Sequence, residues 1–577
     1  ASAVAAQGVI DGGRPSWSIG PGGIVQGVGK DAKIISIGNL YAGAYVEDVY
    51  FFSGLGYDGI ENSGDEPDIV SMSYGSSGTD NDGWDYESRF LELINIIWAQ
   101  DTTFMASTGN GAPGYGTINT PQPNTGISVG ASTLYGSTGT FDSIEDYDQI
   151  LWGDAMSWSD RGPSAQGKVG TDILANGAWG AGDLPLNLGI FYGGGYYAWD
   201  SWGGTSRSAP VAAGNLALVY DAYKKSYGAF PDFDTARAIF KAGANSTNND
   251  SITQGAGYVN ADRSTDVAGK LYGFYVTPDE WNAGNYRGNE YYSFANIVKP
   301  GNTYKEVFTI HNTGTKDIKV DIKDRTLKRI GSKEFTFNTV EAQESSSAFT
   351  RPDYLKKIPK KWIPAGTDLM VVNAIFPFDK FDPDGNYSYN SRWRLLTYDW
   401  TDKNKDGNLW KDTNGNGVVN AGEIDDGEYM RYSYGYGTGT SLQMRVKDPR
   451  ERHHDGIFVG LRHRNHDPSI ANTPVKIKVK FYKYKDWTLK ISPNKLNVPA
   501  GGEKTFKAIL NVPTTAKPVF YNGEILIKDP GDTDHNSHTT TIPVAYNIAR
   551  KRTEFSFGYP SVSNRLYDNG RVKGYFD

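Results

Sequence analysis

The chain has 577 residues, a formal net charge of −8 and no cysteine. It is long enough for several domains, and it holds no disulfide or thiolate site. The acidic balance argues against nucleic-acid binding, which needs a basic surface, and no run of 18 apolar residues predicts a membrane span. Charged residues make up only 21% while Gly and Tyr are abundant, a composition typical of a loop-rich, β-rich chain outside the cell or on its surface.

The first 120 residues alternate between strand and helix patterns. Small residues at 27–29 lead into an apolar run that ends at Ile37. Residues 68–75 predict a buried strand that ends in a turn, and the apolar periodicity of 82–101 predicts a helix. A second buried strand over 103–111 ends in Gly109-Asn110-Gly111, which taken alone is a common turn.

The most informative stretch is a serine placed where small residues give way to an apolar helix. Gly203 and Gly204 let the backbone turn tightly and let a substrate approach closely. Ser206 then lies where the first N–H groups of a helix are unpaired and the helix dipole favours negative charge. Pro210 is tolerated in the first turn of that helix. The pattern predicts a nucleophilic serine; the alternative is a Gly/Ser turn before a core helix.

Helical periodicity stops near residue 268, and short alternating runs separated by turn residues follow. They predict a β-sandwich with calcium loops over 267–486 and a smaller fibronectin-like sandwich over 487–550. Residues 551–577 are interpreted as the start of a further β-rich domain. The predicted fold class is therefore α/β over 1–266, followed by all-β sandwich domains.

Residues 402–423 combine two runs of oxygen-bearing side chains. Residues 412–423 fit the twelve-position calcium-loop template, and 402–408 begin in the same way. The candidate Ca²⁺ ligands are Asp412, Asn414, Asn416 and Glu423 in one loop, with Asp402, Asn404 and Asp406 in the other. No helices flank the loops convincingly, so the sequence predicts structural Ca²⁺. The alternative is a solvated hairpin tip made of Asx turns.

All seven histidines lie beyond residue 300. Those at 453–466, and the Asp/His run at 532–538, stand among Arg and Asp residues and are interpreted as solvated turn residues rather than metal ligands.

The string from Gly204 to Gly214 resembles the catalytic-serine signature of the subtilisin-like serine proteases. The resemblance implies a parallel sheet with helices on both faces, with Ser206 as the nucleophile. It also implies that Asn110 donates its side-chain amide to the oxyanion, a role typically worth about a hundred- to a thousand-fold in rate.

Further segments resemble the family in the same chain order. Ser73, Tyr74 and Gly75, together with Gly109, are similar to the segments that bind a polypeptide substrate, with main-chain hydrogen bonds holding its extended backbone. Residues 172–177 resemble another landmark of the family. Asn176 stands where Pro is common, which leaves the local loop geometry open.

A serine nucleophile needs a base, usually His, that an acid orients. In the family the order is Asp, His, Ser, whereas no histidine here precedes His311. Residues 27–37 are similar to the family sequence that directly follows the catalytic His. We therefore expect the α/β domain to be N-terminally incomplete, with the acid and the base upstream of residue 1 on a separate chain or on a segment not included.

The layout resembles the large archaeal surface subtilases of the pyrolysin kind, and the lack of Cys fits a thermophile. The leading hypothesis is an extracellular or cell-surface serine endopeptidase that acts on polypeptides. The rival is a catalytically silent, subtilase-derived structural component of a cell-surface layer or filament.

Overall fold

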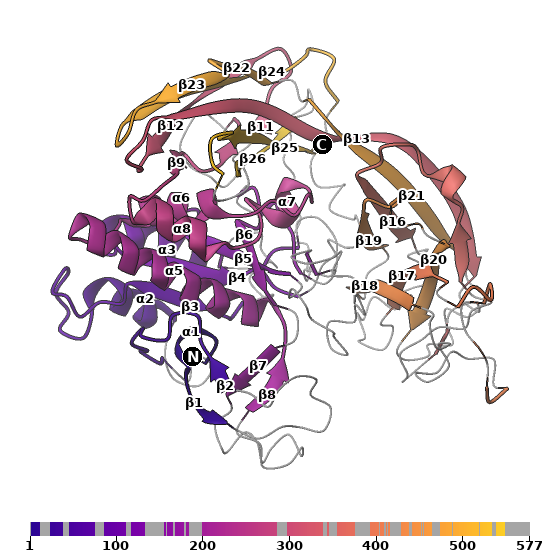
Figure 1. The fold of residues 1–577 in the computed structure, drawn as a ribbon, viewed down its shortest axis with the longest axis horizontal. Helices are drawn as coiled ribbons and strands as arrows, with labels where there is room; N and C mark the ends of the chain where they lie inside the picture. Colours follow the sequence, from indigo (N-terminus) through magenta and orange to yellow (C-terminus); the bar gives the residue numbers. More distant parts are fainter. Residues whose placement is uncertain are drawn as a thin grey trace.

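The computed structural model is shown in Figure 1. It describes residues 2–11, 24–37, 46–75, 86–110, 117–119, 121–132, 155–156, 159–164, 168–177, 180–183, 199–284, 297–338, 343–344, 355–375, 393–402, 404–408, 411, 413–415, 429–437, 441–451, 453, 455–463, 474–486, 489–517, 520–533 and 538–548.

The N-terminal part is built on a parallel sheet. Its four strands lie in the order β3 (Ile69–Met72), β4 (Thr103–Ser107), β5 (Ile127–Ser132) and β6 (Ile173–Asn176). All three neighbouring pairs are parallel. The last three strands are buried along their whole length, as expected of parallel strands covered on both faces.

Helices cover both faces of this sheet because successive side chains point to opposite sides. On one face, Met105 and Val129 pack in one core with residues of α5 (Thr205–Tyr227). On the other face, Phe104 and Ala106 pack with residues of α3 (Tyr86–Ile97). The predicted α/β region, a parallel sheet with helices on both faces that is followed by β structure, is thus confirmed.

The remaining elements of this part surround the sheet. They are α1 (Ser2–Ala5), β1 (Gln7–Asp11), β2 (Ile24–Gln26), α2 (Val46–Leu55), β7 (Gly180–Asp183), β8 (Trp199–Trp202), α6 (Phe233–Gly243), α7 (Ser251–Gln254) and α8 (Ala261–Ala268). β1 pairs with β2 and β7 with β8, both antiparallel. Within the described residues, no helix is both long and apolar enough to cross a membrane.

A β-sandwich formed by two distant parts of the chain packs beside the α/β part (Figure 1). Its strands are β9 (Phe274–Thr277), β10 (Trp281–Asn282), β11 (Ile297–Val298), β12 (Thr303–Asn312), the first part of β13 (Ile318–Asn338), β22 (Leu489–Ser492), β23 (Lys495–Val498), β24 (Glu503–Asn511), β25 (Phe520–Lys528) and β26 (Thr539–Ile548). One core holds side chains from both parts, such as Phe308 and Phe506, whose rings stack at 5.0 Å.

A second β-rich unit lies between those two parts in sequence. It contains the rest of β13, β14 (Gln343–Glu344), β15 (Lys356–Ile358), the 3-10 helix η6 (Lys360–Trp362), β16 (Leu369–Ile375), β17 (Trp393–Thr401), β18 (Tyr429–Gly437), β19 (Ser441–Lys447), β20 (Gly456–His463) and β21 (Pro474–Lys485). It has its own buried core.

Strand β13 joins the two β units, so the observed division differs from the predicted boundary at 486–487. Residues 318–325 of β13 pair with β23 and β25, whereas 326–338 pair with β21. The first sandwich is therefore discontinuous, and the second unit is inserted into it. Alternating runs reveal strands but not their long-range partners, which is why the sequence suggested two consecutive sandwiches. The domain start predicted at 551–577 lies outside the described residues.

Two histidines and one aspartate predicted to be solvated are buried. His453 is 3% exposed and its Nε2 lies 2.7 Å from Ile358 O. His538 Nε2 lies 3.0 Å from Ala242 O of α6, and Asp532 pairs with Arg263 of α8. The interpretation as solvated turn residues is wrong for these three, because tertiary packing places them inside a core or at the contact between the α/β part and the first sandwich.

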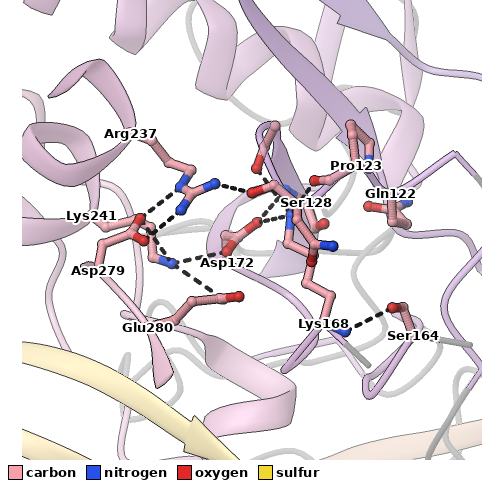
Figure 2. Close-up of polar contacts among 12 residues, drawn as sticks. Gln122, Pro123, Ser128, Ser164, Lys168, Asp172, Arg237, Lys241, Asp279 and Glu280 are labelled. Atoms are coloured by element: carbon pink, nitrogen blue, oxygen red, sulfur yellow. Dashed lines mark hydrogen bonds and ion pairs between the residues drawn. The ribbon is translucent and has the colours of Figure 1, made fainter. Parts of the chain in front are cut away.

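A buried cluster of charged side chains connects the α/β part with the first sandwich, and Figure 2 shows its polar contacts. Asp279 lies just beyond β9 and receives hydrogen bonds from Arg237 of α6 at 2.8 and 2.7 Å. Lys241, one turn further along α6, lies 3.2 Å from Asp279, 2.9 Å from Asp172 and 3.7 Å from Glu280. Lys168 completes the cluster at 2.6 Å from Asp172, which gives three cations and three anions.

Neighbouring charges decide the ionisation of the two aspartates, whereas burial raises the pKa of Glu280. Burial alone would raise the pKa of Asp172, but Lys168 and Lys241 outweigh it and lower that pKa to about 2. Burial likewise opposes ionisation of Asp279, yet Arg237 and Lys241 hold its pKa below the ordinary value. Asp172 directly precedes β6, and its Oδ2 accepts a hydrogen bond from Ser128 N of β5 at 2.7 Å. The cluster therefore also fixes the strand that leads to the candidate site.

Candidate functional site

Ser206 lies in the first turn of α5, beside the carboxyl ends of the parallel strands. Gly204 is the N-cap residue of α5, with φ +126°, and no side chain caps the helix. The Oγ atom of Ser206 donates to Ser73 O beyond β3 at 3.3 Å, and Ser73 Oγ donates to Ser206 O at 2.7 Å. The structure thus brings Ser206 and Ser73 together from positions 133 residues apart.

Asn110 is held against the start of the same helix. Its Oδ1 accepts hydrogen bonds from Thr205 N at 2.8 Å and Thr205 Oγ1 at 3.0 Å. Thr205 Oγ1 also accepts from Gly109 N at 3.0 Å, so a fully buried threonine connects the end of β4 to the start of α5. Because the carboxamide oxygen faces Thr205, the Nδ2 group of Asn110 is left to donate elsewhere.

The space beside Gly204 lies between two hydrogen-bond donors. A methyl group placed on Gly204 would lie 3.4 Å from Asn110 Nδ2, 3.6 Å from Asn110 Oδ1, which already accepts from Thr205, and 3.7 Å from Ser206 N. The Ser206 N–H belongs to the first turn of a helix, where backbone donors have no partner within the helix. An oxygen in this space could accept from both groups, which is the arrangement that stabilises a developing oxyanion. A side chain at Gly204 would occupy it.

Of the other residues expected to bind substrate, Ser73 contacts Ser206 and Gly109 contacts Thr205 at the start of α5. Ser73, Tyr74 and Gly75 follow β3, which is the end strand of the described parallel sheet. Tyr74 is fixed by a hydrogen bond from its hydroxyl to Glu87 of α3 at 2.8 Å. Gly109 has φ +104°, and a Cβ there would lie 2.1 Å from Asp160 Oδ2, so only glycine fits at the end of β4.

Arg207 extends toward the other side of the sheet. Its Nη1 donates to Asn176 O at the end of β6 at 3.2 Å. Its Nε atom is buried and has no hydrogen-bond partner. Burial lowers the pKa of Arg207 to about 10, with Tyr258 acting in the opposite direction, so the guanidinium stays charged at neutral pH.

The described histidines are engaged away from Ser206. His311 stacks on Tyr275 and bonds with Thr277, while His453 and His538 bond with backbone carbonyls, as given above. In the part of the chain that the structure describes, Ser206 Oγ therefore bonds to a carbonyl and to no histidine.

Only part of the predicted calcium region falls within the described residues. Asp402, Asn404, Asp406 and Asn414 are described, whereas Asp412, Asn416 and Glu423 lie outside them. Asp402 Oδ2 accepts from Gly407 N at 2.9 Å, while its Oδ1 is buried without a partner. An orphaned carboxylate oxygen inside a tight loop fits a hard cation, although no cluster of three or more acidic or histidine ligands occurs in the described ranges.

Two residues next to the predicted nucleophile were not recognised as site residues from the sequence. Thr205 lies between Gly204 and Ser206, and it orients Asn110 through two hydrogen bonds. Arg207 was read only as part of the serine string, although a charged residue in an otherwise small and apolar string was the available signal.

Comparisons with known proteins show which proteins the N-terminal part of the chain resembles. Residues 1–258, less than half of the chain, match the sequence model described as the Subtilase family (Peptidase_S8). Tripeptidyl-peptidase 2 of Drosophila melanogaster is 27% identical over 253 residues, which are 42% of this chain and 16% of that protein. Serine protease AprX of Bacillus subtilis (strain 168) is 28% identical over 218 residues, 35% of this chain and 44% of that protein. The chain thus spans less than half the length of these curated relatives.

Among solved structures, a crystal structure of tripeptidyl peptidase 2 aligns with a TM-score of 0.29 and 11% identity. The alignment covers 85% of this chain and 56% of that chain.

Proposed function

We propose that residues 1–258, which match the subtilase family, carry the nucleophile of a serine endopeptidase that hydrolyses polypeptides. The observation that carries the proposal is the space beside Gly204, flanked by Asn110 Nδ2 and Ser206 N. A Gly/Ser turn in front of a core helix has no need of an asparagine clamped in this orientation by Thr205.

The proposed reaction proceeds through an acyl-enzyme. Ser206 Oγ forms a bond to the carbonyl carbon, and its proton passes through a general base to the leaving amine as the C–N bond breaks. Asn110 Nδ2 and the Ser206 N–H stabilise the oxyanion. Water then hydrolyses the ester with the base acting in the same way. Ser73, Tyr74, Gly75 and Gly109 bind the acyl part of the substrate.

We propose that a polypeptide segment outside residues 1–577 supplies the base, a histidine, together with its acid. No histidine precedes His311 in the sequence, and β3 has one unpaired edge in the described sheet. Near the start of the chain, Ile34 (46%), Ile35 (41%) and Ile37 (40%) are exposed. Apolar side chains with such exposure suit contact with a further protein segment.

Active-site labelling tests the proposal directly. A phosphonofluoridate should label Ser206 in the complete polypeptide, and Ser206→Ala should abolish the labelling. Residues 1–577 alone should label far more slowly, because no histidine among the described residues bonds to Ser206. Labelling at another residue, or none in the complete polypeptide, would contradict the proposal.

The rival function is a silent, subtilase-derived component of a cell-surface layer or filament. The β-rich half of the chain favours it, whereas the oriented Asn110 favours the enzyme. Assembly of the Ser206→Ala protein into filaments, combined with no labelling of the complete wild-type polypeptide, would support the rival.

We further propose that the protein acts outside the cell or at its surface and that residues 402–423 hold Ca²⁺. The buried, unpartnered Oδ1 of Asp402 supports the second point, and the low share of charged residues supports the first. Asp402, Asn404 and Asp406 would serve one ion, and Asp412, Asn414, Asn416 and Glu423 another. The ions would brace the β17–β18 connection and take no part in the chemistry.

A further inference from the structure

Arg207 is a cation with an incomplete set of partners beside the candidate nucleophile. Among the described residues it makes one side-chain hydrogen bond, to Asn176 O, and no ion pair. Its Nε is buried and unpartnered. By contrast, the buried Arg237 is matched by Asp279, and Arg263 by Asp532.

Leaving such a group unmatched costs stability. Arg207 is partly buried, and its Nε atom, which is shielded from water, lacks the hydrogen bond that would offset its desolvation. A guanidinium presents its N–H groups in a planar fork that matches the two oxygens of a carboxylate. A carboxylate on a bound ligand would therefore complete the hydrogen bonds of the Arg207 guanidinium.

The sheet order fixes the side of Ser206 on which this carboxylate would lie. Ser206 bonds to Ser73 beyond β3, at one end of the described sheet. Arg207 bonds to Asn176 at the carboxyl end of β6, at the other end of that sheet. If the acyl part of the substrate lies along 73–75, the Arg207 guanidinium lies on the leaving-group side.

We propose that Arg207 is a specificity residue that selects substrates with an acidic side chain directly after the scissile bond. The inference rests on the proposed peptidase function, since it needs Ser206 to attack a peptide carbonyl. Arg207 remains in place through the reaction and exchanges no proton with the substrate.

The test compares two peptides that differ only in the residue after the cleaved bond, Asp or Asn, with the complete polypeptide as enzyme. A hydrogen bond to a charged group is worth enough to favour the Asp peptide by about ten- to a hundred-fold in kcat/KM. The preference should vanish in acid, as the substrate carboxyl is protonated near its ordinary pKa of about 3.9.

Variants at position 207 test whether the preference for the Asp peptide depends on Arg207. Arg207→Gln keeps a donor for Asn176 O and should bring the Asp/Asn ratio close to one. Arg207→Lys keeps the charge and should retain part of the preference. Lys225→Gln serves as the matched control, because Lys225 is an exposed cation at the far end of the same helix, paired with Asp221, and it should leave the ratio unchanged.

Labelling of Ser206 separates this inference from the proposed function. If the wild type is labelled and its Asp/Asn ratio is near one, Arg207 is no specificity residue while the peptidase proposal stands. A high ratio that survives in Arg207→Gln also overturns the inference. Absence of labelling in the complete polypeptide overturns both. The wild-type ratio needs no variant, so the test holds even if Arg207→Gln fails to fold.

Discussion

Neutralising Asp279 should destabilise the contact between the α/β part and the first β-sandwich. Asp279 is 6% exposed and is shared by Arg237, through two hydrogen bonds, and by Lys241 at 3.2 Å. Asp279→Asn keeps the shape of the side chain but leaves three cations facing two anions. The excess positive charge would lie on α6, the helix that follows α5 in the chain.

The size of the effect follows from burial. Removing one partner of a buried ion pair costs about 3–5 kcal/mol, because the other charge is left uncompensated. For a cooperative unit of about 380 residues, the α/β part together with the first sandwich, this lowers the melting temperature by roughly 4–6 °C. The exposed Lys225–Asp221 pair, at 2.6 Å, is a matched control, since such a helical surface pair contributes only about 0.3–0.5 kcal/mol.

The assay is thermal and urea unfolding of the wild type, Asp279→Asn and Asp221→Asn at neutral pH. The reasoning predicts a large shift for the first variant and almost none for the second. Equal shifts, within about 0.5 kcal/mol of each other, would show that the buried cluster is worth no more than a surface pair.

Four further outcomes are expected. Asn110→Ala should lower kcat about a hundred- to a thousand-fold with little change in KM; an unchanged kcat would remove Asn110 from the oxyanion site. Gly204→Ala should abolish labelling of Ser206, because the methyl group fills the space beside Asn110 Nδ2 and the backbone has φ +126°. Asp172 has a folded-state pKa lowered to about 2, so its contribution to stability is present above about pH 4 and is lost as the pH falls toward 2; acid melts of Asp172→Asn should lack this component. EDTA should lower the melting temperature of the wild type, and should lower that of Asp402→Asn less because this variant keeps only the second proposed site; an unchanged wild-type curve would indicate a plain hairpin tip.

The buried cluster also explains why the α/β part and the first sandwich are expected to unfold together. Arg237 and Lys241 belong to α6, whereas Asp279 and Glu280 lie between β9 and β10 of the sandwich. Separating the two parts would take Asp279 and Glu280 away from Arg237 and Lys241, and each of these charged side chains would lose its partners. Ion pairs thus tie the first sandwich to the α/β part, and the sandwich is not a freely attached module.

The sequence by itself determined the local features of the site. A serine after small residues and before an apolar helix placed Ser206 at the start of α5, since helix starts and turns are set by neighbouring residues. Strand ends at Ser73 and Asn110 were readable for the same reason. The alternation of apolar residues likewise predicted the change to β structure near residue 268, whereas the parallel sheet was implied by the resemblance to the subtilisin-like proteases.

Only the tertiary structure decided how distant segments combine. The pairing of β12 with β24, which joins residues about 200 positions apart, has no local signal, because any alternating strand can pair with any other. The clamp of Thr205 on Asn110, the burial of His453 and the incomplete partners of Arg207 likewise depend on which segments meet. Charge and hydrogen-bond balance are properties of the assembled core, so a sequence read one segment at a time does not contain them.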